Sequence, residues 1–207
     1  MAEGLSDFDL LDAWGNGDLN AGGVLFERHF RTLYRFLRTK VEAGLEDLLQ
    51  QIWLACVEGR ARFRREASFR TYLLRVARFQ LYAHYRARNR EPSQIDFTLT
   101  SVADLDASPS QLLARRQDER LLLEALKRVP LDHQIALELR FWEDLSGPEM
   151  AEVLGIPEPA VRSRIRRATE RLKQELTALM TGPAGADESI DDLDGWAQRL
   201  RQALFAD

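Results

Sequence analysis

The stretch LSGPEMAEVLGIPEPAVRSRIRRATERLKQEL, residues 145–176, decides how the second half of this 207-residue chain folds. Ser146 followed by Glu149 forms a capping box, which predicts the start of a helix. This helix should end just before Gly155, because glycine readily closes a helix in a left-handed turn. Pro157 then predicts the first turn of a longer helix. A short helix, a glycine turn and a long basic helix are the plan of a helix-turn-helix motif.

The long second helix of this motif has two different sides. Its apolar residues recur at helical spacing and predict the buried side: Val161, Ile165, Ala168, Leu172 and Leu176. Arginines gather near its start on the other side, as in a recognition helix that enters the major groove of DNA. Arg162 and Arg166 are the candidates for contacts with base edges. Phosphate contacts are expected from the other polar residues of this side: Ser163, Arg164, Arg167 and Arg171.

The rest of the chain divides by its periodicity. Two apolar repeats separated by Pro130, LLLEALKRV and DHQIALELRFW, extend the helical pattern, so residues 112–178 are predicted to form one domain. Residues 91–111 have no helical period and contain two prolines and four serines, which predicts an extended, solvated and flexible linker. Residues 1–90 are helical again, with a short leading helix over 5–20. We therefore expect an all-α fold of two small helical domains.

Positive charge is concentrated in residues 60–90, which hold ten arginines and one acid, Glu66. Within this segment, cations and rings share one stripe of a predicted helix: Arg75, Arg78, Phe79, Tyr82, Tyr85 and Arg86. Cations that bind phosphates, beside rings that stack on bases, are the combination that single-stranded nucleic acid requires. Two simpler interpretations remain open, namely a solvated charged face and aromatic rings that belong to the core.

Three stretches, in this order, carry a family resemblance: EDLLQQIWLACV (46–57), ASFRTYLLRVARFQLYAHYRARNR (67–90) and ALELRFWEDLSGPEMAEVLGIPEPAVRSRIRRATERLKQEL (136–176). Together they resemble the extracytoplasmic-function group of sigma-70-type factors of bacterial RNA polymerase. The resemblance covers about residues 5–178. It implies that the first stretch docks on the polymerase clamp coiled coil. It also implies that the second opens the promoter strands, behind a loop that captures a flipped minus-10 base, and that the third reads the minus-35 element. An alternative sigma factor is therefore expected, with promoter DNA and core polymerase (clamp coiled coil and flap) as its partners.

The resemblance also assigns residues of the first domain. Polar side chains within one turn of the docking helix, with a tryptophan as anchor, are expected to bind polymerase: Asp47, Gln50, Gln51 and Trp53. The loop and the helix that follows it are expected to bind the minus-10 element: Arg60, Arg62, Arg64, Arg65, Ser68, Tyr72, Arg75, Arg78, Phe79 and Tyr82. The sequence departs from the family pattern at three positions. Tyr72 stands where tryptophan is usual, Phe79 where asparagine is frequent and Pro159 where glycine is frequent.

Two other classes of function can be weighed against this expectation. A helix-turn-helix regulator that acts without core polymerase is the alternative, but it has no use for an arginine–aromatic stripe and a docking helix. An enzyme is not expected, because the three histidines (His29, His84 and His133) lack metal-ligand spacing and Cys56 has no local basic partner. We expect no cofactor and no metal. The single cysteine, the acidic start and the lack of a long apolar run predict a cytoplasmic protein without a membrane segment.

Residues 179–207 form an acidic extension. Apolar residues at helical spacing predict that it contains an amphipathic helix: Ile190, Leu193, Trp196, Leu200 and Leu204. From residue 183 onward it carries six acids against Arg199 and Arg201. We expect that the extension docks on one of the chain's basic surfaces and tunes activity by inhibiting DNA binding, an effect that salt should weaken. A tail that instead holds the active arrangement and a merely solubilising tail are the alternatives. An anti-sigma factor is the other regulator that the resemblance implies.

Overall fold

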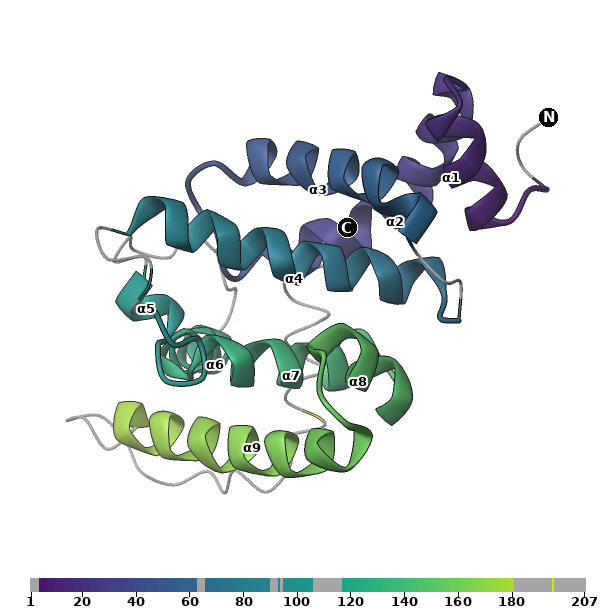
Figure 1. Ribbon diagram of the computed structural model, residues 1–207. Coiled ribbons are helices and arrows are strands. Elements are labelled where there is room, and N and C mark those ends of the chain that lie inside the picture. Colours follow the sequence, from purple (N-terminus) through teal and green to yellow (C-terminus); the bar gives the residue numbers. More distant parts are fainter. Residues whose placement is uncertain are drawn as a thin grey trace. The chain divides into compact units, whose positions relative to one another are not determined.

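The computed structural model describes residues 4–62, 66–89, 93, 95–105, 117–180 and 195, and most of these residues are helical (Figure 1). Among them no strand occurs, and one isolated bridge pairs Ser101 with Pro130. The chain divides into two compact units, one that extends to Arg88 and one that contains most of the chain from Asn89 onward. The predicted all-α class and its two helical units are confirmed.

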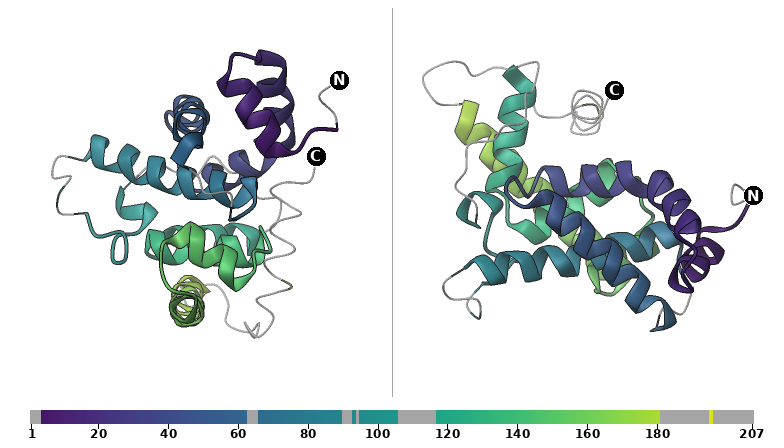
Figure 2. Two further views of the ribbon diagram at one scale, coloured as in Figure 1. Left: turned by 45° about the vertical axis from the view of Figure 1, so that its right-hand side comes forward. Right: turned by 90° about the horizontal axis from the view of Figure 1, so that it is seen from above.

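The first unit is built from α1 (Asp7–Gly15), α2 (Leu19–Arg38), α3 (Leu45–Gly59) and α4 (Phe69–Arg88), with the short turn η1 (Arg60–Arg62) after α3. Packing of α1 on α2 and of α3 on α4 encloses the core (Figure 2). Its fully buried side chains are mostly branched and aliphatic: Leu25, Leu33, Leu37, Leu48, Ile52, Leu73, Leu74 and Leu81.

Local capping explains where the first helices begin. Ser6 and Asp9 form a reciprocal capping box at the start of α1. The carboxylate of Asp18 accepts hydrogen bonds from the backbone N–H groups of Asn20 and Ala21, at 3.0 and 3.1 Å, and so begins α2. The leading helix predicted over residues 5–20 is therefore interrupted, because α1 ends at Gly15 and a new helix starts before residue 20.

The second unit contains the predicted helix-turn-helix. It consists of α6 (Gln117–Arg128), α7 (Leu131–Phe141), α8 (Gly147–Leu154) and α9 (Glu158–Met180). The Ser146 backbone N–H donates to the Glu149 carboxylate at 2.9 Å, and Gly155 closes α8 with a φ of 64°. Packing of α9 against α6 and α7 forms a cluster that includes Leu122, Leu126, Leu137, Trp142, Ala168, Leu172 and Leu176. Both helices of the motif lie where the sequence predicts them.

Residues 95–105 of the predicted linker are packed, whereas the sequence predicted an extended, solvated segment there. Phe97 is buried, and its carbonyl accepts a 3.0 Å hydrogen bond from the Asp132 N–H at the start of α7. The Thr100 carbonyl accepts another from Leu131, at 2.9 Å, and the short helix α5 (Val102–Leu105) follows. Residues 95–105 thus dock on the second unit through backbone hydrogen bonds and through the buried side chains of Phe97 and Val102. The rest of the predicted linker lies largely outside the described residues.

The acidic extension falls beyond the part of the chain that can be described, apart from Met180, where α9 ends, and Gly195. The amphipathic helix over residues 190–204 and its docking on a basic surface therefore stay predictions. Among the helices that the structure does describe, none is both long enough and apolar enough to cross a bilayer.

Candidate functional site

The outer face of α3 presents the predicted polar ridge. Asp47, Gln50 and Gln51 are exposed, whereas Leu48 and Ile52 on the opposite face are buried. The structure therefore brings the three polar candidates together on one accessible surface. Their spacing in the sequence was sufficient to place them, because i, i+3 and i+4 positions share one side of a helix.

Trp53 does not share this exposure. Its side chain is part of the core, with 5% of its surface exposed, and its ring lies 5.4 Å from Phe26 and 6.2 Å from Trp14. Because the protein's own rings already surround it, Trp53 has little surface left for a partner, and its role as an anchor stays a prediction. Its indole Nε1 has no hydrogen-bond partner in the described part of the chain.

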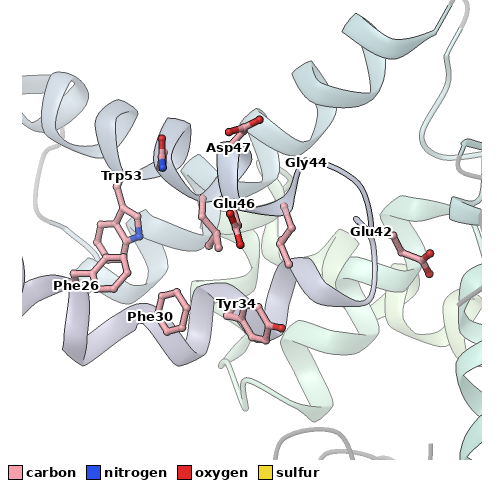
Figure 3. A pocket seen from close by; sticks show the side chains of 11 residues that line it. Phe26, Phe30, Tyr34, Glu42, Gly44, Glu46, Asp47 and Trp53 are labelled. Carbon is pink, nitrogen blue, oxygen red and sulfur yellow. The ribbon is translucent and has the colours of Figure 1, made fainter. Parts of the chain in front are cut away.

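A groove of about 640 Å³ runs between α2 and α3, next to the polar ridge (Figure 3). Aromatic rings of α2 form one wall, from Phe26 at one end toward Tyr34 at the other. Trp53 of α3 lies next to Phe26. Carboxylates give it an acidic rim: Glu42, Glu46 and Asp47. Helical spacing alone does not distinguish a groove from a core, so the sequence carries no signal that Phe26 and Phe30 line this groove.

Two residues of the predicted minus-10 loop point into the first unit. Arg60 is half-buried and donates to the carbonyls of Val57 and Gly15, at 2.9 and 3.1 Å. Tyr72 is buried, and its hydroxyl donates to the Cys56 carbonyl at 3.0 Å. Burial raises the pKa of Tyr72 to about 12, so the phenol keeps the proton that it donates. Both side chains are thus engaged inside the first unit, and their predicted contacts with DNA stay predictions.

The remaining candidates of this loop are less fully described. Ser68 is exposed, and its hydroxyl accepts a 3.1 Å hydrogen bond from the Thr71 N–H, so it caps the start of α4. The side chain of Arg62, and Arg64 and Arg65 as a whole, lie outside the described residues.

The side chains of the arginine–aromatic stripe lie on α4, and only some of them are exposed. Phe79 is 53% exposed, and the guanidinium carbons of Arg75 and Arg78 lie 6.0 and 5.9 Å from the centre of its ring. Arg78 also lies 4.8 Å from the Tyr82 ring centre and donates from Nε to the Tyr82 hydroxyl at 2.9 Å. Tyr85 faces inward and donates to the Lys40 carbonyl. The core interpretation thus holds for Tyr85 and for Tyr82, both of which are buried, whereas the Phe79 ring is available to a ligand.

On α9 the arginines divide into two groups. Arg162, Arg166 and Arg167 are exposed, as a groove-reading surface requires. Arg164 instead forms a 2.7 Å ion pair with Asp132 of α7, with 16% and 6% of the two side chains exposed. The predicted phosphate contact of Arg164 is corrected: it lies three residues after Val161 and four before Ala168, so it turns toward the apolar face.

The other polar residues of α9 are tied to their own helix. Arg166 and Arg171 pair with Glu170 and Glu175 one turn later, at 3.0 and 2.8 Å. Arg167 donates to the Ser163 carbonyl, and the Ser163 hydroxyl donates to the Pro159 carbonyl, at 3.3 Å each.

The surroundings of Cys56 and His133 shift the pKa values of their side chains. Burial raises the pKa of the Cys56 thiol well above its usual value, which keeps it neutral. Burial, followed by the charges of Arg164 and Arg167, lowers the pKa of His133. No group of three or more metal-ligating side chains occurs among the residues that could be searched.

Comparison with known proteins identifies the same two units. Residues 25–91 match the family model of sigma-70 region 2, and residues 119–172 match that of sigma-70 region 4. The chain is 30% identical over 179 residues to the ECF RNA polymerase sigma factor SigM of Mycobacterium tuberculosis, which covers 86% of this chain and 88% of that protein. It is 28% identical over 190 residues to the ECF RNA polymerase sigma-E factor of Haemophilus influenzae, covering 87% and 100%.

Two solved structures share the fold. CnrH, in complex with the cytosolic domain of CnrY, matches with a TM-score of 0.59 at 24% identity, over 83% of this chain and 97% of that one. The sigma factor RpoE of Bartonella quintana, in complex with the anti-sigma factor NepR, matches with a TM-score of 0.54 at 22% identity, over 77% and 97%.

Proposed function

Because the chain belongs to the extracytoplasmic-function group of the sigma-70 family, we propose that its three candidate surfaces divide the work of transcription initiation. The protein is an alternative sigma factor, which acts with core RNA polymerase and recognises promoters. In the proposed division, α3 binds polymerase, α4 holds unpaired minus-10 DNA and α9 reads the minus-35 duplex. None of these tasks requires bond chemistry, and the proposed place of action is the cytoplasm, with polymerase.

The polymerase surface is supported by the ridge and the groove together. The ridge presents polar side chains on one side of α3, and the groove has aromatic walls beside an acidic rim. Aromatic area surrounded by polar groups is the composition of a protein interface. A partner helix that carries apolar and basic side chains fits this surface, and the polymerase clamp coiled coil is the proposed partner.

The minus-10 surface is carried by one observation, the exposed ring of Phe79 with two guanidinium groups beside it. Flipping or unpairing a base costs a few kcal/mol, which stacking on a ring can offset. The minus-35 surface is supported by Arg162, Arg166 and Arg167, which are exposed near the start of the second helix of a helix-turn-helix. The flap of polymerase is the proposed partner of this second unit.

Transcription from defined templates tests the whole proposal. Core polymerase with this protein should give run-off transcripts from a subset of a genomic promoter library, and neither component should do so alone. Asp47→Arg should weaken binding to core polymerase by roughly fivefold or more, because it reverses a charge in the interface. Glu27→Arg is the matched control, since Glu27 is an exposed acid of the neighbouring helix α2 that does not line the groove. Equal loss in both variants would remove the docking assignment.

Regulation by a separate protein is a further part of the proposal. Each solved neighbour is bound to a second protein, the cytosolic domain of CnrY in one and the anti-sigma factor NepR in the other. We propose that this sigma factor is controlled either by such a partner or by its own acidic extension. A chain that ends at residue 181 should distinguish the two, because self-inhibition predicts stronger promoter binding than in the full chain, most clearly at low salt.

A further inference from the structure

The arginine-rich segment between α3 and α4 is held at both ends by contacts inside the first unit. Arg60 lies at its beginning, as the first residue of η1. Tyr72 lies at its end, in the first turn of α4. Both side chains turn away from solvent and bind backbone carbonyls at the ends of other helices.

Arg60 joins the ends of two helices. Its Nη1 donates to the carbonyl of Val57 in the last turn of α3, and its Nη2 donates to the carbonyl of Gly15, the last residue of α1. Carbonyls in the last turn of a helix lack a partner within the helix and carry the negative end of its dipole. One guanidinium, with donors in a rigid fork, satisfies both groups at once.

Tyr72 makes the corresponding contact from the other end of the segment. Its hydroxyl donates to the carbonyl of Cys56, which also belongs to the last turn of α3. The two ends of the segment are thus fixed on neighbouring carbonyls of one helix terminus. The last turn of α3 serves as the common support.

Two glycines leave room for these two side chains. A Cβ at Gly15 would lie 2.1 Å from Nε of Arg60, and the three nearest atoms all belong to that side chain. A Cβ at Gly59 would lie 2.6 Å from the Tyr72 hydroxyl, while the next atom is 3.8 Å away. Neither glycine is among those with positive φ, so backbone conformation does not demand glycine at these positions. Each glycine therefore matches one particular side chain.

We propose that Arg60 and Tyr72 are positioning residues which, with Gly15 and Gly59, form a clasp that fixes η1 and the first turn of α4 on the last turn of α3, so that α4 can hold unpaired minus-10 DNA. This inference rests on the proposed minus-10 function of α4. A helix that is fixed in advance loses less conformational entropy when DNA binds, which favours strand opening over closed-complex formation. Arg60 and Tyr72 act through the chain and do not touch DNA.

The test uses full-length variants assembled with core polymerase on a promoter selected by run-off transcription. Permanganate reactivity of unpaired thymines measures open complex, titration measures polymerase binding, and thermal unfolding measures the fold. Arg60→Ala and Gly15→Ala should each lower open-complex formation by roughly fivefold, about the loss expected for one typical intramolecular hydrogen bond. The Gly15→Ala/Arg60→Ala double variant should be no worse than Arg60→Ala alone, because the side chain that a new Cβ would strike is gone.

Gly59 and Tyr72 give an independent test, in which the side chain that meets the new methyl group is a tyrosine instead of an arginine. Gly59→Ala should lower open-complex formation, because the new methyl group displaces the Tyr72 hydroxyl. Tyr72→Phe removes that hydroxyl and leaves the nearest ring atom 3.8 Å from the new Cβ. The Gly59→Ala/Tyr72→Phe double variant should therefore open DNA as well as Tyr72→Phe does by itself. Polymerase affinity should stay unchanged in all of these variants.

Three outcomes would overturn the clasp. Unchanged opening in Gly15→Ala, with a loss in Arg60→Ala, would mean that Arg60 contacts DNA directly. Additive losses in both double variants would mean that the glycines and side chains act separately. A parallel loss of polymerase affinity and thermal stability would leave only a structural role. The Arg75→Ala/Arg78→Ala variant distinguishes the clasp from the proposed minus-10 function. Normal DNA opening in this variant would contradict the minus-10 function of α4. If this variant loses DNA opening while the glycine variants open DNA normally, only the clasp is contradicted.

Discussion

In α4 the guanidinium group of Arg78 lies beside the rings of Phe79 and Tyr82, whereas in α9 those of Arg164, Arg166 and Arg171 lie beside carboxylates. A ring attracts a cation without cancelling its charge, and an exposed ring can stack on a base. A carboxylate one turn away orients an arginine along the helix and can be exchanged for a phosphate. These surroundings fit the proposed division, in which α4 holds unpaired bases and α9 reads a duplex.

The largest expected effect distinguishes the arginines within α9. Arg164→Met should lower the free energy of unfolding by about 3 kcal/mol, because it leaves the buried carboxylate of Asp132 without its charge partner. Urea or thermal unfolding measures this change. Arg166→Met is the control and should cost at most about 0.5 kcal/mol, since its pair with Glu170 is exposed. Equal destabilisation by the two substitutions would contradict the division of α9 into a structural arginine and DNA-binding arginines.

The next effect tests the aromatic surroundings of α4. Arg75→Ala/Arg78→Ala should reduce open-complex formation by roughly tenfold to a hundredfold, since each of the two lost contacts with a phosphate or base contributes about 0.7–1.4 kcal/mol. Permanganate footprinting measures opening, and titration with core polymerase should give an unchanged affinity. Arg88→Ala is the matched control, because Arg88 is exposed on the same helix but lies outside the arginine–aromatic stripe. Equal losses of opening and of polymerase binding would mean that Arg75 and Arg78 are structural.

A smaller effect concerns sequence preference on the duplex. Arg166→Ala should relax the preference at particular minus-35 bases by about 1–3 kcal/mol, the usual range for a bidentate contact with guanine. A screen of promoter variants measures this preference. Arg171→Ala should instead weaken binding uniformly and reduce its salt dependence. A uniform loss in Arg166→Ala would assign Arg166 to the phosphates as well.

The smallest effect is a pH dependence of the second unit. The pKa of His133 is lowered by burial and by the nearby charges of Arg164 and Arg167, so the unfolded chain binds a proton more readily than the folded one. Stability should therefore be complete above the usual histidine pKa of about 6.5 and decline as the pH falls below it. His133→Gln should flatten this part of the profile in unfolding measurements. A profile that is identical in the two proteins would exclude His133 as the cause.

Local signals in the sequence were sufficient wherever structure depends on neighbouring residues. The capping box at Ser146, the turn at Gly155 and the apolar face of α9 all act within a few residues, and each was predicted. The exposed ridge on α3 followed from helical spacing in the same way. Short-range physics thus located the helix-turn-helix and the candidate surface for polymerase.

Long-range partners could not be read from the sequence. Arg60 and Arg164 look like DNA-binding arginines until Gly15 and Asp132, which lie 45 and 32 residues away along the chain, are found beside them. Phe97 was assigned to a solvated linker because one ring in a polar stretch carries no periodicity. Charge patterns predict where cations are, and only the fold decides which of them remain available to a ligand.

The position of Cys56 makes the first unit convenient for spectroscopy. This thiol is fully buried, and its raised pKa leaves almost no thiolate at neutral pH to react with maleimides or oxidants. A cysteine introduced at Glu58 or Arg88, both exposed, would therefore react with a dye selectively while the protein is folded. Fluorescence from dyes at these two sites would test whether α3 meets polymerase and whether α4 meets DNA, without removal of the natural cysteine.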